Sequence, residues 1–98
     1  MEKRTPHYRL TTIKSLLNEG KIRSTQNARR GAVLIGADFK AMCEVLESLT
    51  STDFYKSMTT YSDHKIWQDV YRPNTVHGDI YLKLTIIDDV VIISFKEL

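Results

Sequence analysis

The sequence is poor in cysteine and contains no long apolar run. Cys43 is the only cysteine among the 98 residues, so neither an intramolecular disulfide nor a cysteine zinc cluster can form, and we expect a reducing cytoplasm. No apolar run approaches the roughly 18–20 residues that span a bilayer, and the first twenty residues lack the continuous apolar region of a signal peptide. These absences predict a protein that is neither exported nor inserted in a membrane.

The length and composition fit one soluble domain over residues 1–98. Hydrophobic residues make up 42% of the chain and charged residues 27%, which is typical of a globular protein and not of a disordered or fibrous one. Charge is distributed unevenly. Residues 1–30 contain eight Lys/Arg and two Glu, whereas residues 31–98 contain six Lys/Arg and ten Asp/Glu. The basic end favours a polyanionic or acidic partner, and a solvated helix face is the alternative explanation.

The first half of the chain predicts a basic arm followed by helices. Pro6 excludes a helix in the arm, Glu2–Arg9. Apolar residues then repeat at three- and four-residue spacing. The predicted helices are Leu10–Glu19, Gln26–Ile35 and Phe39–Leu49. The predicted N-terminal caps are Thr11 or Thr12, Thr25 and Asp38, and the predicted stops are Gly20 and Gly36.

The third helix has the clearest apolar stripe, and it contains the cysteine. The stripe is Phe39, Met42, Cys43, Leu46 and Leu49. Free cysteine is often buried as a small hydrophobic residue, and no histidine is nearby in the sequence to activate it. We therefore interpret Cys43 as a core residue and not as a nucleophile.

From Asp53 onward the apolar period changes to two, which predicts a sheet. The predicted strands are Phe54–Thr60, Ile66–Tyr71, Asp79–Ile87 and Val90–Lys96. If Asp88-Asp89 is the turn of the last hairpin, the pairs facing the helices are Leu82 with Phe95, Leu84 with Ile93 and Ile86 with Val91. The pairs on the other face are Tyr81 with Lys96 and Lys83 with Ser94, and only an odd loop would break this pairing. The fold class is therefore α+β, with the N-terminal helices on one face of a mainly antiparallel sheet that ends in a C-terminal hairpin.

The stretch Asp53–Pro73 contains five of the nine aromatic residues, interleaved with basic side chains. Aromatic faces stack on unpaired bases and cations neutralise phosphates, so this pattern favours binding of single-stranded RNA. Aromatics on strands are also common as core residues or cross-strand pairs. The Tyr81–Lys96 pair has a similar alternative, a solvated contact worth about a few tenths of a kcal/mol.

Several runs make the chain resemble the MqsR family of toxins from end to end. The runs are MEKRTPH at Met1–His7, DFYKSMTTYSDH and IWQDVYRP across Asp53–Pro73, and YLK, DV and SFKE between Tyr81 and Glu97. The resemblance implies an mRNA interferase with a RelE-like fold, a metal-free toxin that cuts single-stranded mRNA around GCU-type triplets and arrests translation. It also implies a cognate antitoxin similar to MqsA, whose toxin-binding domain holds zinc.

The resemblance also implies a set of catalytic residues, namely Lys56, Gln68, Tyr81 and Lys96. Such a set suits cleavage by the ribose 2′-hydroxyl, with Lys56 as base or phosphate ligand, Tyr81 as acid or phosphate donor, Lys96 as stabiliser of the phosphorane and Gln68 as a positioning group. Lys56 and Gln68 share a sheet face only if their connection has an odd number of residues or contains a bulge. We therefore predict one of these two irregularities.

Arg72 and His7 are candidate substrate contacts, because Arg72 ends a strand and His7 lies in the N-terminal run. The three histidines, His7, His64 and His77, lack metal-ligand spacing, so we predict no metal and no cofactor. We expect the toxin alone to be a monomer. Two other classes remain open at this point, a non-catalytic RNA-binding module and a protein-interaction domain.

Overall fold

The computed structural model describes residues 1–98. Its strands form one sheet of seven strands. The strands are β1 (Glu2–Lys3), β2 (Ile22–Ser24), β3 (Phe54–Thr59), β4 (Trp67–Tyr71), β5 (Asn74–Thr75), β6 (Gly78–Ile87) and β7 (Asp89–Glu97). Their order is β1-β3-β4-β6-β7-β2, with β5 paired to β6. Only β2 and β7 run parallel. The predicted α+β class with a mainly antiparallel sheet is confirmed.

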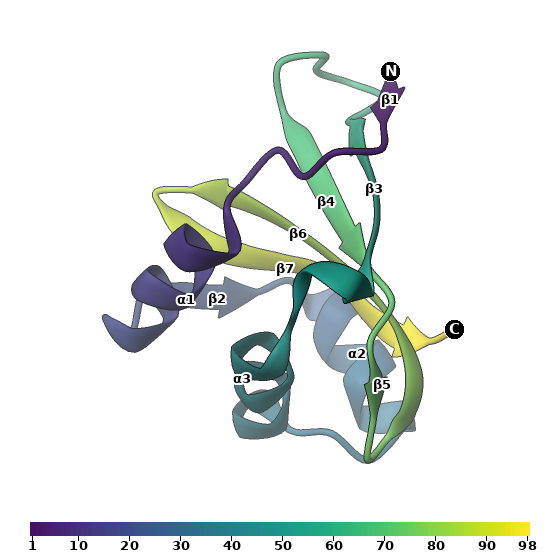
Figure 1. The fold of residues 1–98 in the computed structure, drawn as a ribbon. Helices are drawn as coiled ribbons and strands as arrows, with labels where there is room; N and C mark the ends of the chain where they lie inside the picture. Colours follow the sequence, from purple (N-terminus) through teal and green to yellow (C-terminus); the bar gives the residue numbers. More distant parts are fainter.

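Three helices cover part of one face of this sheet. They are α1 (Leu10–Asn18), α2 (Gln26–Leu34) and α3 (Phe39–Ser48), and a short 3-10 turn, Ser51–Asp53, leads into β3. Figure 1 shows the helices gathered around β2, β6 and β7, while β3 and β4 extend away from them toward the N-terminus. No helix of the chain is long and apolar enough to cross a membrane.

Two of the three predicted N-terminal caps are confirmed. The side chains of Thr25 and Asp38 accept hydrogen bonds from the amides of Ala28 and Ala41. The prediction for the first helix was wrong, because its N-cap is Arg9 and no side chain caps it. The helix begins one residue before Thr11, where the preceding amides of His7 and Tyr8 donate to the Asp69 carboxylate and fix the entry of the chain.

The hydrophobic core lies between the helices and the hairpin of β6 and β7. Ile13, Ala28, Ala32 and the apolar residues of α3 pack against the inward side chains of the hairpin. The α3 stripe differs from the prediction in two places. Cys43 is only partly buried and is not among the core residues, and Phe39 is 43% exposed while Val45 is buried instead. Phe39 is the first residue of the helix, ahead of the turns that reach the core.

Gly31 lets α2 lie directly on β7. A Cβ at this position would come within 2.2 Å of the Phe95 carbonyl oxygen, closer than real atoms approach. A glycine in a helix interior ordinarily weakens the helix by roughly 0.5–1 kcal/mol relative to alanine. Here the glycine permits α2 to approach β7 closely at Phe95, the residue before Lys96.

The C-terminal hairpin keeps only part of the predicted register. Tyr81 pairs with Lys96, Leu82 with Phe95 and Lys83 with Ser94, as expected. Beyond a bulge the pairing slips by one residue, so Leu84 faces Ile92 and Ile86 faces Val90, and the predicted pairs Leu84–Ile93 and Ile86–Val91 were wrong. The turn is the cause, because Asp88 alone, at φ +63°, separates Ile87 from Asp89.

The connection between β3 and β4 has one of the two predicted irregularities, the odd loop. Thr60 and Ile66 close it through a backbone hydrogen bond, which leaves an odd loop of residues 61–65. The bulge of β3 lies between Phe54 and Lys56, outside the connection, and does not change the pairing of Lys56 through Thr59. Lys56 therefore faces Val70, and Met58 faces Gln68. Lys56 and Gln68 share a face as predicted, although they are diagonal neighbours and not a direct pair.

The N-terminal arm is less irregular than the sequence suggests. Glu2 and Lys3 form β1, which pairs antiparallel with Met58 and Ser57 of β3. Alternation then places the Glu2 side chain on the face of Lys56 and the Lys3 side chain on the opposite face.

Candidate active site

We call the face of the sheet that turns away from the helices the open face. It carries a continuous row of four paired residues. Lys56 pairs with Val70, Val70 with Lys83, and Lys83 with Ser94, on β3, β4, β6 and β7 respectively. Val70 has no exposed surface although it lies away from the helical core. Its cross-strand neighbours on both sides are lysines, whose aliphatic stems are suited to cover it while their ammonium groups reach solvent.

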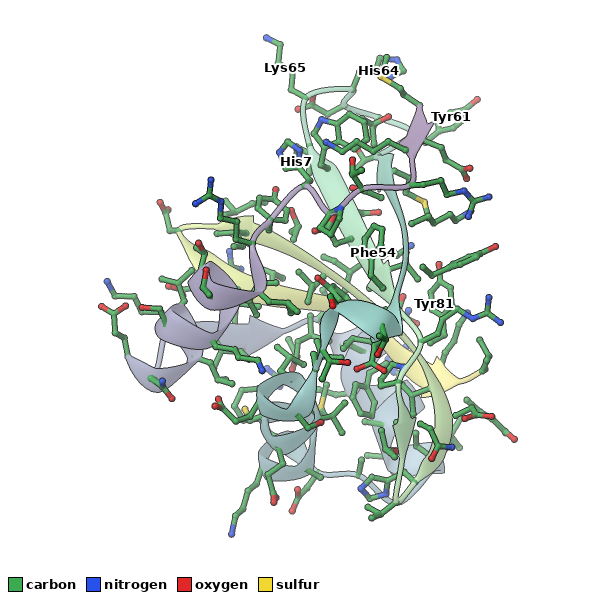
Figure 2. The ribbon with its side chains drawn as sticks, in the orientation of Figure 1. His7, Phe54, Tyr61, His64, Lys65 and Tyr81 are labelled. Carbon is green, nitrogen blue, oxygen red and sulfur yellow. The ribbon has the colours of Figure 1, made fainter.

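Tyr81 and Lys96 form a second pair on the open face, adjacent to that row. They are directly opposite in the hairpin register, and the Lys96 ammonium lies 5.3 Å from the centre of the Tyr81 ring. Figure 2 shows Tyr81 projecting from one side of the sheet, with His7 on the other side of β3 and β4. A phenol and an ammonium are thus held together on the surface of rigid strands.

Lys56 is paired with an acidic residue from the N-terminal arm. Its ammonium donates to the Glu2 carboxylate at 2.6 Å, and this hydrogen bond raises the pKa of Lys56 and lowers the pKa of Glu2. Both shifts favour the charged forms. Lys56 is therefore a cation and not a free amine while Glu2 is in place.

Lys83 has the opposite electrostatic environment. Partial burial lowers its pKa, and the positive charges of Lys96 and Lys56 lower it further. No carboxylate lies within 4.0 Å of its ammonium. Of the three lysines on this face, Lys83 is the one whose surroundings favour the neutral amine.

A groove begins at Gln68 and Lys83 and runs toward the loop after β3. It has a volume of about 870 Å³ and is also lined by Met58, Thr59, Thr60, Tyr61, His64 and Met1. This volume lies within the range of small-molecule sites, about 300–1,000 Å³. Tyr61 is fully exposed at the groove and Figure 2 shows it close to His64 at the tip of the loop.

Arg72 lies at the other end of the open face, next to Tyr55. The Arg72 guanidinium is 4.5 Å from the centre of the Tyr55 ring, and the Lys56 ammonium and the Arg4 guanidinium approach the same ring at 5.5 Å and 5.4 Å. The electron-rich face of the ring thus gathers three cations. Arg72 joins the candidate site at its edge.

His7 lies apart from this group. Its ring stacks on Trp67 at 5.3 Å between centroids, its amide donates to Asp69, and its Nδ1 is 3.0 Å from the Lys3 ammonium. Trp67 pairs with Thr59 and alternates with Gln68, so this cluster occupies the helix side of the sheet. The structure thus places His7 on the opposite face from Lys56 and Gln68, and its role as a substrate contact stays a prediction.

The remaining chemistry-bearing residues do not form a second centre. Cys43 is only partly buried, yet this burial raises its pKa, which opposes a nucleophilic role. No group of three or more His, Cys, Asp or Glu side chains gathers in the structure.

The comparison with known families adds a decisive observation. A family model described as "Motility quorum-sensing regulator, toxin of MqsA" matches residues 5–97. The chain belongs to the MqsR toxin family. The mRNA interferase toxin MqsR of Escherichia coli (strain K12) is 60% identical to it over 97 residues, which make up 99% of each chain.

Sequence reasoning missed two residues that lie beside the predicted catalytic set, Lys83 and Glu2. The signal for Lys83 was present, because the hairpin pairing that brings Tyr81 to Lys96 also places Lys83 on the same face. Glu2 had no comparable signal. It is separated from Lys56 by 54 positions, and only the pairing of β1 with β3 brings them together.

Proposed function

We propose that this chain is the toxin of a toxin–antitoxin pair and acts as a sequence-selective endoribonuclease, an mRNA interferase that cuts single-stranded mRNA at GCU-type sites and arrests translation. The proposal follows from membership in the MqsR family and from the full-length relationship to the mRNA interferase toxin of E. coli. Its substrate places the enzyme in the cytoplasm. The partner is an antitoxin related to MqsA, and the free toxin is a monomer.

The observation that supports this function best is the joint position of Lys56, Gln68, Tyr81 and Lys96 on the open face. These residues come from four neighbouring strands, and the register gives their side chains one common face. Arg72 extends the same surface. His7 is not included, because it stacks with Trp67 on the other side.

The reaction we propose uses the RNA itself as the nucleophile and needs no metal. The ribose 2′-oxygen bonds to the adjacent phosphorus, the bond from phosphorus to the 5′-oxygen breaks, and the products are a 2′,3′-cyclic phosphate and a 5′-hydroxyl. A base must take the 2′ proton and an acid must protonate the leaving oxygen, each step contributing about 10²–10⁴-fold. A well-placed donor to the phosphorane adds about 3–4 kcal/mol.

The contacts of each side chain favour particular roles. Glu2 keeps Lys56 charged, which suits a phosphate ligand better than a base. The Lys96 ammonium, exposed beside Tyr81, suits stabilisation of the phosphorane. Tyr81 then protonates the leaving oxygen, and Gln68, at the start of the groove, positions the neighbouring nucleotide.

The test is cleavage of a defined single-stranded RNA containing GCU triplets, in excess EDTA, with both ends of each product mapped. We expect cuts at the triplets with cyclic phosphate ends, strongly reduced in Tyr81→Phe and Lys96→Met. Tyr71→Phe and Lys40→Met are matched controls, because Tyr71 is in the core and Lys40 is exposed on α3. Intact RNA that binds equally well to all variants would instead indicate a non-catalytic binding module. Activity that EDTA abolishes would refute the metal-free reaction.

A further inference from the structure

Lys83 occupies the point where the lysines of the open face and the groove meet. In the register it is the residue of β6 that lies across β4 from Lys56, and it is two residues from Tyr81 on its own strand. It also lines the groove beside Gln68. Any RNA phosphate that reaches Lys56 and Lys96, with its adjacent nucleotide in the groove, must pass over Lys83.

The ammonium of Lys83 lacks the polar partners that a partly buried structural lysine normally has. It makes no ion pair and no side-chain hydrogen bond within the protein, although it is half-buried. The charged groups facing it are Lys56 from β3 and Lys96 from β7, and the only carboxylate in this cluster, Glu2, is bound to Lys56. The other titratable residues that line its groove are His64, Tyr61 and the N-terminal Met1. These surroundings disfavour the charged form of Lys83, and a bound anion such as a phosphate would offset this effect.

We propose that Lys83 is a fifth catalytic residue of this site, and that its amine takes the proton from the attacking ribose 2′-hydroxyl. This inference rests on the proposed function and deepens it by assigning the base. The 2′ proton moves to the Lys83 nitrogen as the 2′-oxygen bonds to phosphorus, and the departing 5′-oxygen receives its proton from Tyr81. Lys56 and Lys96 remain protonated throughout and hold the phosphate.

The surroundings of Lys83 support the base role over that of a third phosphate ligand. A base must lose its proton before the reaction, and burial together with two neighbouring cations lowers the pKa of Lys83. Lys56 differs, because its bond to Glu2 raises its pKa. The two lysines of one cross-strand row thus have opposite surroundings: those of Lys56 raise its pKa, and those of Lys83 lower it.

The test compares Lys83→Arg with Lys83→Met in single-turnover cleavage of the GCU-containing RNA. Arginine keeps the positive charge but cannot serve as a base, since its pKa is above about 12. We expect Lys83→Arg to bind an RNA with a 2′-deoxy residue at the scissile position as tightly as the wild type does, and to cleave the all-ribose RNA about 10²–10⁴-fold more slowly. Lys40→Arg and Lys40→Met, on exposed α3, are the matched controls and should cleave normally.

Two further measurements separate a base from a structural residue. Cleavage by the wild type should rise with pH up to the lowered pKa of Lys83, and the residual activity of Lys83→Arg should lack this rise. Added ethylamine should restore cleavage to Lys83→Ala and leave the wild type unchanged. Lys83→Met keeps the aliphatic stem beside Val70, so its melting temperature should not fall.

The outcomes distinguish this inference from the proposed function. If the wild type and Lys83→Arg cleave the RNA at equal rates, the assignment of Lys83 as the base is wrong and the proposed function still stands. A positive charge at this position would then be sufficient for cleavage. A wild type that cleaves no RNA overturns both. Slow cleavage by Lys83→Arg, with intact binding and amine rescue of Lys83→Ala, establishes Lys83 as the base.

Discussion

Glu2 is bound to the ammonium of Lys56, the group that we propose as a phosphate ligand. Its carboxylate occupies the ammonium that we assign to the phosphate, at 2.6 Å, and the pair is exposed to solvent on the Glu2 side. The same contact keeps Lys56 protonated. Glu2 therefore favours the charged form of Lys56, which a phosphate ligand needs, and at the same time occupies the ammonium that would bind the phosphate.

Replacing Glu2 with glutamine should strengthen RNA binding. We expect Glu2→Gln to lower the dissociation constant of the 2′-deoxy RNA by about two- to five-fold, the size of effect expected for an exposed ion pair. The measurement is a fluorescence anisotropy titration at low salt. Glu19→Gln, which breaks only the exposed pair with Lys21, is the control and should not change affinity. Weaker binding by Glu2→Gln would show that the carboxylate orients Lys56 and does not compete.

Tyr71 is the one buried side chain whose polar atom has no partner. Its hydroxyl is fully buried without a hydrogen bond, and burial, with the Asp69 and Asp53 carboxylates, raises its pKa to about 12. The protonated phenol thus stabilises the folded state below pH 10.0, its ordinary pKa, and this contribution is lost as the pH rises toward about 12.

Tyr71→Phe should be at least as stable as the wild type at pH 7. Removing an unpaired buried hydroxyl is expected to raise the free energy of unfolding by up to about 1 kcal/mol. Urea unfolding at pH 7 and at several values between 10 and 12 measures both effects, and the variant should lose less stability over the alkaline range. Tyr61→Phe, at a fully exposed position, should show neither change. A destabilised Tyr71→Phe would mean that the hydroxyl has a partner in solution.

At the scale of the elements, the contact of α2 with β7 determines where Lys96 lies. Gly31 faces the Phe95 carbonyl, and Lys96 is the next residue of the strand. The bulge that faces the step from Lys83 to Leu84 lies on β7 itself, where Ile93 is the extra residue, and it absorbs the one-residue slip that Asp88 introduces. The functional part of the hairpin therefore keeps its register although its tip does not.

Gly31→Ala should destabilise the protein, against the usual effect of this substitution in a helix. Alanine ordinarily stabilises a helix interior by roughly 0.5–1 kcal/mol, whereas overpacking costs about 1–3 kcal/mol. We expect a net loss of unfolding free energy, measured by urea denaturation, and slower RNA cleavage because β7 shifts. Val33→Ala, exposed on the same helix, should change neither. A stabilised Gly31→Ala would show that α2 can move away without cost.

At the scale of the whole molecule, the basic N-terminal third does not form one surface. Lys21 and Arg23 pair with Glu19 and Asp89, and Lys3 lies over Trp67 on the helix side. Among the basic residues of this region, Arg4 is the one that approaches the candidate site, where it lies over the ring of Tyr55. The cations that face the proposed substrate come mainly from the sheet.

The salt dependence of RNA binding should reflect those few cations. If Lys56, Lys96 and Arg72 contact phosphates, the slope of log K against log salt should be about −2, at about −0.7 per contact for single strands. Lys96→Met should make the slope shallower by about 0.7. Arg30→Met, on the exposed side of α2, should leave it unchanged. A slope that falls equally in both variants would indicate binding through diffuse charge.

The sequence by itself determined the fold class, the family and the face on which most site residues lie. These follow from local patterns: helical spacing and caps in the first half, alternation in the strands, and long runs shared with MqsR toxins. Alternation in the hairpin was enough to place Tyr81, Lys83 and Lys96 together, because the pairing near its open end survived.

Only the tertiary structure decided the rest. The odd loop that brings Lys56 to the face of Gln68 depends on how β3 closes against β4, and two aligned strands of the same sequence could slip by one residue. The ion pair of Glu2 with Lys56, the removal of His7 to the other face and the cationic surroundings of Lys83 depend on contacts between distant segments. Local pattern fixes which way a side chain alternates, whereas packing and register fix which charges it meets.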